Sequence, residues 1–150
     1  MGFTDNLSKH ISTLGFIGHL PYAPGTFGTA FAFLLTIILK PDDFTLLMIF
    51  VPVFLLGIIT SHNAERILGK DSKHIVIDEF CGYLLAVVFI PKSAGYLLAA
   101  FILFRVFDIF KPPPIKKIEE IVQGGAGIML DDIMAAIYTN ICIQLWRVFV

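Results

Sequence analysis

The sequence contains little charge, few cysteines and no basic segment. Only 15% of its 150 residues are charged, and the formal net charge is -1. Because no run of lysine and arginine is long enough to form a basic arm, nucleic acid is not expected as a partner. The two cysteines, Cys81 and Cys142, lack CxxC spacing. Neither a disulfide nor a zinc site is therefore indicated.

Hydrophobic residues make up 57% of the chain, and the mean hydropathy is +0.83. This composition is typical of a membrane protein, although a compact and unusually apolar helical globule is the alternative. Leucine, alanine, phenylalanine and isoleucine mix without strict alternation, which favours helices over strands. We therefore predict an all-α fold: one small membrane-embedded helical domain spanning residues 1–150, with short or re-entrant helices.

The apolar residues form four stretches, and none is a comfortable span of about twenty residues. They are residues 27–39, 44–60, 80–104 with a break at Pro91-Lys92, and 133–146. The polar segments 61–79 and 105–132 carry most of the lysine and arginine residues of the chain. The positive-inside tendency therefore places both segments in the cytoplasm. Residues 80–104 must then enter and leave on one face, as a re-entrant hairpin that turns at the break.

This topology brings four motifs to one side of the membrane. They are "GHLPYAPGTFGT" (18–29), "DEFCG" (78–82), "FRVFDIFKPPP" (104–114) and "GGAGIMLDD" (124–132). Each lies at the end of an expected helix. A shared site can therefore form where they meet.

Two acidic pairs open apolar segments, Asp78-Glu79 and Asp131-Asp132, and Asp108 adds a fifth carboxylate. Acids in a first helical turn are often only caps that favour the helix dipole. Two pairs beside a fifth acid, in a chain with so few charges, indicate instead a site for a hard divalent cation such as Mg²⁺. Neighbouring helical residues point about 100° apart, so only one of each pair need be a direct ligand.

Cations accompany these acids. Arg105, Asp108 and Lys111 recur every third residue on one side of a helix that Pro112 ends. Arginine can clamp phosphate oxygens in a two-pronged contact, and lysine supplies a point charge. The alternative is an Arg105–Asp108 ion pair, with Lys111 extending to the membrane interface; both uses can coexist.

A turn rich in glycine and threonine precedes the first apolar stretch. Its Gly25, Thr26 and Thr29 could cradle an anion at a helix N-terminus. A simple capping turn explains these residues almost as well, and the lysine of a nucleotide P-loop is missing.

Together the four motifs, in this order, resemble the phosphatidylglycerophosphatase A family of lipid phosphatases over nearly the whole chain. The matching residues are Pro21, Pro24, Gly25, Thr26, Gly28, Asp78, Glu79, Phe80, Gly82, Phe104, Arg105, Asp108, Lys111, Pro112, Pro114, Ile115, Gly124, Gly125, Gly127, Ile128, Met129, Asp131 and Asp132. In one departure, Leu20 stands where a serine usually precedes the first proline. Any role of that hydroxyl is then absent or taken by Thr26 or Thr29.

The resemblance implies a phosphoric monoester hydrolase that uses Mg²⁺. Its reaction would convert phosphatidylglycerophosphate to phosphatidylglycerol and phosphate in glycerophospholipid biosynthesis. The enzyme would sit in the bacterial inner (cytoplasmic) membrane among membrane lipids, with its active site facing the cytoplasm. We expect metal binding and catalysis from the two acidic pairs, metal support or general-base catalysis from Asp108, and phosphate binding from Arg105 and Lys111, assisted by Gly25, Thr26 and Thr29.

Signatures of other enzymes are absent. Cys81 lacks the phosphate loop of a cysteine phosphatase, and no DxDx[TV] nucleophile motif occurs. Hydrolysis by a metal-positioned water is therefore favoured over a covalent route. The rival from another class is a small transporter or ion-binding protein, which would need carboxylates facing each other at mid-membrane depth. A structural membrane subunit would leave the grouped acids and bases unexplained.

Overall fold

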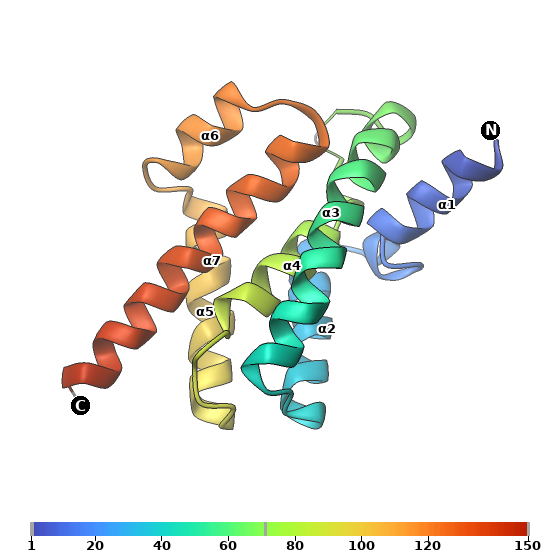
Figure 1. Cartoon of the computed structure of the whole chain (residues 1–150). Helices are drawn as coiled ribbons and strands as arrows, with labels where there is room; N and C mark the ends of the chain where they lie inside the picture. The colour runs from blue at the N-terminus through green and yellow to red at the C-terminus, as the bar shows by residue number, and fades with distance from the viewer. Residues whose placement is uncertain (1, 71, 150) are drawn as a thin grey trace.

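The computed structural model describes residues 2–70 and 72–149, which form helices and no strands (Figure 1). The predicted all-α fold is confirmed. The helices are α1 (Phe3–Ser12), the short 3-10 helix η1 (Ile17–His19), α2 (Pro24–Leu39), α3 (Asp43–Leu68), α4 (Ile77–Ala86), α5 (Ala94–Phe110), α6 (Ile115–Ile121) and α7 (Gly124–Phe149).

Local sequence signals explain several helix boundaries. Pro24 occupies the first turn of α2, where its missing N–H costs nothing. Asp42 caps α3 by accepting a 2.7 Å hydrogen bond from the Thr45 amide. The same helix ends at Gly69, whose φ of +96° suits only glycine. These signals set the long apolar helix between two polar turns.

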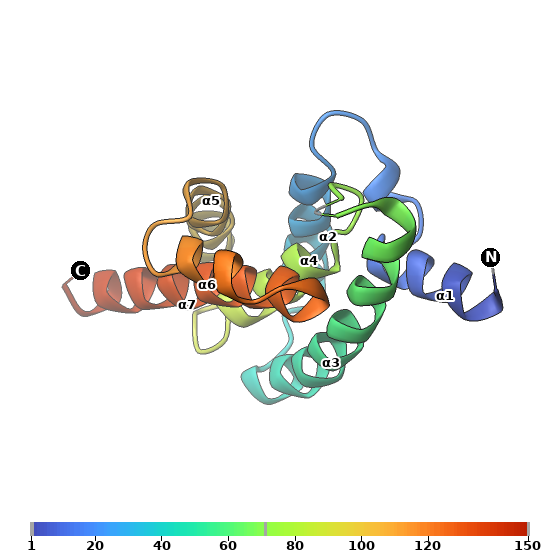
Figure 2. The ribbon, with the colours of Figure 1, turned by 90° about the horizontal axis from the view of Figure 1, so that it is seen from above.

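Helix α4 lies at the centre of the bundle and packs against α2, α3 and α7 (Figure 2). Most of its residues are buried, including Phe80, Cys81 and Tyr83. The Tyr83 hydroxyl donates a 2.8 Å hydrogen bond to the Leu97 carbonyl of α5. The break foreseen at Pro91-Lys92 falls in the connection from α4 to α5. The short central helix α4 therefore contacts α2, α3, α5 and α7 and joins them in one bundle.

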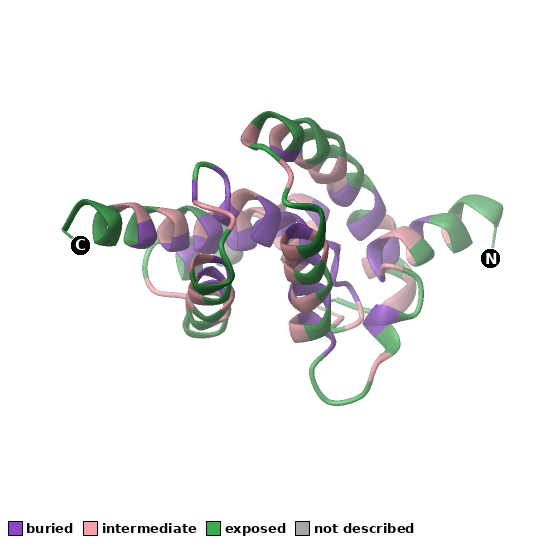
Figure 3. Cartoon of the chain, turned by 90° about the horizontal axis from the view of Figure 1, so that it is seen from below, coloured by how far each residue is buried: buried purple, intermediate pink, exposed green. Residues whose placement is uncertain are grey.

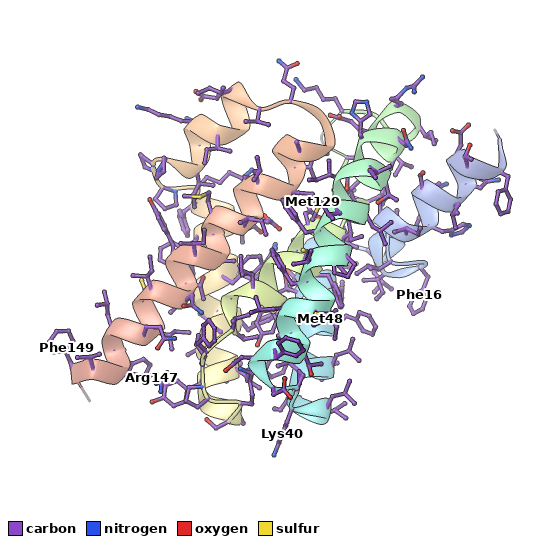
Figure 4. All side chains as sticks on the ribbon, in the orientation of Figure 1. Phe16, Lys40, Met48, Met129, Arg147 and Phe149 are labelled. Carbon is purple, nitrogen blue, oxygen red and sulfur yellow. The ribbon has the colours of Figure 1, made fainter. Side chains whose placement is uncertain are left out.

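The connections gather at two ends of the bundle. Those after α3, α5 and α6 lie at the upper end in Figure 1, and those after α2 and α4 lie at the lower end. At the lower end Lys92 Nζ is 2.7 Å from Asp43 Oδ1, and Lys40 points away from the bundle (Figure 4). The polar segments that the sequence placed on one side thus share the upper end.

The outer faces of the long helices are apolar and exposed, whereas the buried residues lie where helices meet (Figure 3). Met48 points outward from α3, while Met129 lies between α7 and α3 against Gly57 (Figure 4). Helices α3 and α7 are long and apolar enough to cross a membrane. Exposed apolar side chains on α2, α3, α5 and α7 include Leu34, Ile38, Leu55, Ile59, Leu98, Ile102, Ile141 and Leu145.

Candidate active site

The five acidic side chains that the sequence singled out come from three helices and line one cleft of about 300 Å³, called here the acidic cleft. Asp78 and Glu79 come from the first turn of α4, and Asp108 from the last turn of α5. Asp131 and Asp132 are buried within α7. The packing of α4 against α5 and α7 brings these carboxylates together from positions up to 54 residues apart (78 to 132).

Three of these acids form a cluster suited to a cation. Asp78, Glu79 and Asp132 can each place an oxygen within 4.8 Å of the other two. One oxygen of each carboxylate is buried and has no hydrogen-bond partner among the described residues. Buried polar atoms normally have partners, and hard oxygen donors are what Mg²⁺ and similar ions prefer. The residues therefore fit a divalent metal.

The electrostatics of Asp78 agree with this arrangement. Burial, and then the charge of neighbouring Glu79, raise the pKa of the Asp78 carboxyl well above its usual range. Like charges brought together in a partly dry site repel each other. Without a counter-charge, the cluster is therefore a destabilising element of the fold.

Asp131 faces a different partner from its neighbour Asp132. Its Oδ2 accepts a 2.6 Å hydrogen bond from Lys111 Nζ, and its Oδ1 accepts one of 3.0 Å from the Asp132 amide. Adjacent helical residues point in different directions, so one acid joins the cluster and the other binds the lysine. In α4, by contrast, both acids belong to the cluster.

Lys111 ends α5 and lines the acidic cleft. Its backbone is in the left-handed region, with φ of +43°, and its amide donates to the Phe107 carbonyl. Pro112 follows, so the helix cannot continue. The end of α5 thus places an ammonium group beside the carboxylates.

Arg105 lies behind the carboxylates rather than among the cleft-lining residues. Its guanidinium forms an ion pair with Asp108, and its Nη1 is 3.8 Å from Glu79 Oε1. The ion-pair alternative raised by the sequence is therefore present. Direct contact of Arg105 with a phosphate stays a prediction, and the structure adds a role in holding two cleft carboxylates.

The start of α2 packs against the same carboxylates. A Cβ added to Gly25 would overlap the Glu79 carboxylate and lie 3.4 Å from Arg105 Nη1. Thr29 is fully buried, and its hydroxyl donates to the Gly25 carbonyl at 3.0 Å. Thr26 is half-buried, and none of the three lines the acidic cleft. Their predicted contact with an anion remains untested, whereas close packing of Gly25 is a structural fact.

Sequence reasoning did not single out several residues that line the acidic cleft. They are Glu65, Lys70, Ser72 and Lys73 around the α3–α4 connection, and Glu120 and Gln123 at the end of α6 and beyond. Lys70 and Lys73 belong to the polar segment 61–79, which indicated only the membrane topology. Lys70 and Lys73 line the same cleft as residues of α7, and this proximity depends on tertiary packing that a local sequence pattern does not reveal.

Comparisons with known proteins identify the family of this chain. The family model for phosphatidylglycerophosphatase A matches residues 10–147. A phosphatidylglycerophosphatase A from Haemophilus influenzae is 40% identical over 145 residues, covering 91% of this chain and 89% of the relative. The Escherichia coli enzyme of the same name is 35% identical, covering 85% of this chain and 77% of the relative.

A third relative carries another name. A putative phosphatidylinositol-3-phosphatase from Bacteroides thetaiotaomicron is 36% identical, covering 87% of each chain. No solved structure gives a significant match. The match to the family model includes every residue described in the acidic cleft, and the chain belongs to the phosphatidylglycerophosphatase A family.

Proposed function

We propose that this chain is a magnesium-dependent lipid phosphatase that hydrolyses phosphatidylglycerophosphate to phosphatidylglycerol and phosphate in glycerophospholipid biosynthesis. The observation that carries this proposal is the cluster of Asp78, Glu79 and Asp132 in the cleft that Lys111 also lines. Each acid of the cluster has a buried oxygen without a hydrogen-bond partner among the described residues. A phosphate monoester needs such a combination, because its oxygens bind both a hard cation and a lysine. Two of the relatives described are named for this substrate.

Asp78, Glu79 and Asp132 would hold the Mg²⁺. Bound there, the ion would polarise a phosphoryl oxygen and make a bound water more acidic. Asp131 orients Lys111 through their 2.6 Å hydrogen bond. The lysine can then contact the phosphate and stabilise charge on the glycerol oxygen as the phosphorus–oxygen bond breaks.

Asp108 is the proposed general base. It lines the acidic cleft, and its ion pair with Arg105 occupies one carboxylate oxygen, Oδ2. The other oxygen, Oδ1, would accept a proton from the attacking water. Arg105 would hold Asp108 and Glu79 in position and, as the sequence predicts, assist in binding phosphate.

The proposed location is the bacterial inner membrane, with the acidic cleft facing the cytoplasm. Helices α3 and α7 have the length and hydropathy of membrane spans, and exposed apolar side chains extend over α2 and α5. Arg66, Lys70 and Lys117 lie at the cleft end of the bundle, which the positive-inside tendency assigns to the cytoplasm. The transporter alternative is disfavoured because Asp78, Glu79 and Asp108 lie in terminal turns of α4 and α5.

Phosphate release from phosphatidylglycerophosphate by the purified protein tests the proposal directly. We expect release with Mg²⁺ and none after chelation, and Asp132→Asn should serve as the inactive control. Phosphatidylinositol 3-phosphate should be assayed in parallel, because one relative is named for it. Faster hydrolysis of that lipid would reassign the substrate, and hydrolysis of neither would overturn the proposed function.

A further inference from the structure

Lys70 and Lys73 lie on the wall of the acidic cleft formed by the connection between α3 and α4. Both side chains are exposed. Among the residues and side chains that the structure describes, neither ammonium has an ion-pair or hydrogen-bond partner. Lys92, by contrast, is bound by Asp43 and two carbonyls. The two cleft lysines are therefore available to a ligand.

The cleft also continues past Lys70. A second hollow of about 420 Å³ adjoins it, lined by His62, Glu65, Arg66, Lys70, Gln123 and Gly124. Four of these, Glu65, Lys70, Gln123 and Gly124, line the acidic cleft as well. A ligand held at the carboxylate cluster can thus extend along one continuous groove, with Lys70 at the boundary between its two parts.

The described lining of the acidic cleft carries more acidic than basic side chains. Among the described residues, seven acidic side chains line the cleft, against three lysines. A metal would offset the cluster of Asp78, Glu79 and Asp132, and Lys111 already binds Asp131. A substrate with a second negative charge would still approach Glu65 and Glu120. Lys70 and Lys73 are the lining groups placed to offset that repulsion.

We propose that Lys70 and Lys73 form a subsite for a second phosphate, the phosphodiester of a lipid head group whose terminal phosphate lies at the carboxylate cluster. This inference rests on the proposed function and specifies its substrate class. A lipid that carries its phosphate monoester one glycerol unit beyond a phosphodiester fills both positions. Phosphatidic acid, which has the monoester alone, fills only the first.

Inhibition of the protein by two probes distinguishes binding at the carboxylate cluster from binding at the Lys70–Lys73 subsite. Phosphatidylglycerol carries the phosphodiester without the monoester, and inorganic phosphate resembles the monoester alone. Assays in non-ionic detergent micelles should compare the parent chain with Lys70→Ala/Lys73→Ala. The matched control is Lys116→Ala/Lys117→Ala, which removes two exposed lysines of α6 that do not line the cleft.

We expect the Lys70→Ala/Lys73→Ala variant to raise KM for phosphatidylglycerophosphate and the inhibition constant of phosphatidylglycerol by about twenty-fivefold, which is about fivefold for each of the two exposed ion pairs lost. Inhibition by inorganic phosphate should be unchanged, and the control should match the parent chain. Equal weakening of both inhibitors, or an equal effect in the control, would show only a general surface-charge effect and overturn the subsite. Unchanged constants would also overturn it.

The parent chain is measured first, so failure of the proposed function is distinguishable. If the parent chain does not hydrolyse phosphatidylglycerophosphate, the proposed function fails and the subsite falls with it. If it does, and the lysine variant retains parental KM and inhibition, only the subsite is wrong.

Discussion

Lys111 and Asp131 join the end of α5 to α7, with 2.6 Å between the ammonium nitrogen and carboxylate Oδ2. Their side chains are only 25% and 10% exposed, so this ion pair is shielded more than a surface pair. The contact places a cation beside the carboxylate cluster. It also ties together two helices that supply different parts of the acidic cleft.

Replacing Lys111 should impair turnover more than folding. We expect Lys111→Ala to lower kcat by about a hundredfold, because a cation at the leaving oxygen stabilises charge that develops in the transition state. The Mg²⁺ concentration for half-maximal activity should change little. Steady-state kinetics at varied Mg²⁺ would check both, and parental turnover in the variant would remove Lys111 from the phosphate site.

The carboxylate cluster predicts metal binding that can be measured without activity. Mg²⁺ should raise the unfolding temperature of the parent chain, because a ligand that binds the folded state stabilises it. Glu79→Gln and Asp132→Asn should abolish both that shift and phosphatase activity, since an amide keeps the shape of the side chain and loses its charge.

Asp131→Asn provides an informative comparison. Asp131 lies outside the cluster of three, so this variant should lose activity while it keeps part of the Mg²⁺-dependent shift. Variants that unfold without metal would instead support a capping role for these acids. A full thermal shift in Glu79→Gln or Asp132→Asn would exclude that residue as a ligand.

Arg105 should be sensitive to geometry as well as to charge. We expect Arg105→Ala to lower turnover by about a hundredfold, in line with loss of a preorganised electrostatic contact. Arg105→Lys should recover only part of this loss, because one ammonium cannot reproduce the contacts of a planar guanidinium with Asp108 and Glu79. Full recovery by lysine would show that positive charge alone is required.

The close approach of α2 to the site predicts a strict requirement for glycine at position 25. Gly25→Ala should displace the Glu79 carboxylate and abolish most activity, since the added Cβ would occupy its place. The matched control is Gly95→Ala in α5, where a Cβ meets nothing within 4 Å. Phosphate release and the Mg²⁺-dependent unfolding shift would be measured in both. Parental values in Gly25→Ala would contradict the close packing.

Membrane orientation can be tested by cysteine labelling in a background lacking Cys81 and Cys142. Cysteines replacing Arg66 and Lys117, at the cleft end of the bundle, should react from the cytoplasmic side. A cysteine replacing Lys40, at the opposite end, should react from outside. All three replaced side chains are exposed. Labelling of positions 66 and 117 from different sides would separate the parts of the proposed site.

The sequence by itself determined the helical class and identified the residues able to take part in catalysis or metal binding. Apolar stretches without alternation predicted helices, and the tripled proline after Lys111 predicted where α5 ends. The break at Pro91-Lys92 marked the connection before that helix. These features depend on short segments of chain, where backbone preference and side-chain periodicity act locally.

Only the tertiary structure decided which partner each of those side chains contacts. Asp131 and Asp132 are equivalent in sequence, yet α5 lies beside one and α4 beside the other. Packing also placed Arg105 behind the acidic cleft and Lys70 on its wall, whereas the sequence had singled out only Arg105. The partner of each side chain depends on helices that are distant in the sequence. Burial of the apolar faces of these helices determines the angles at which they cross, and therefore which side chains come into contact.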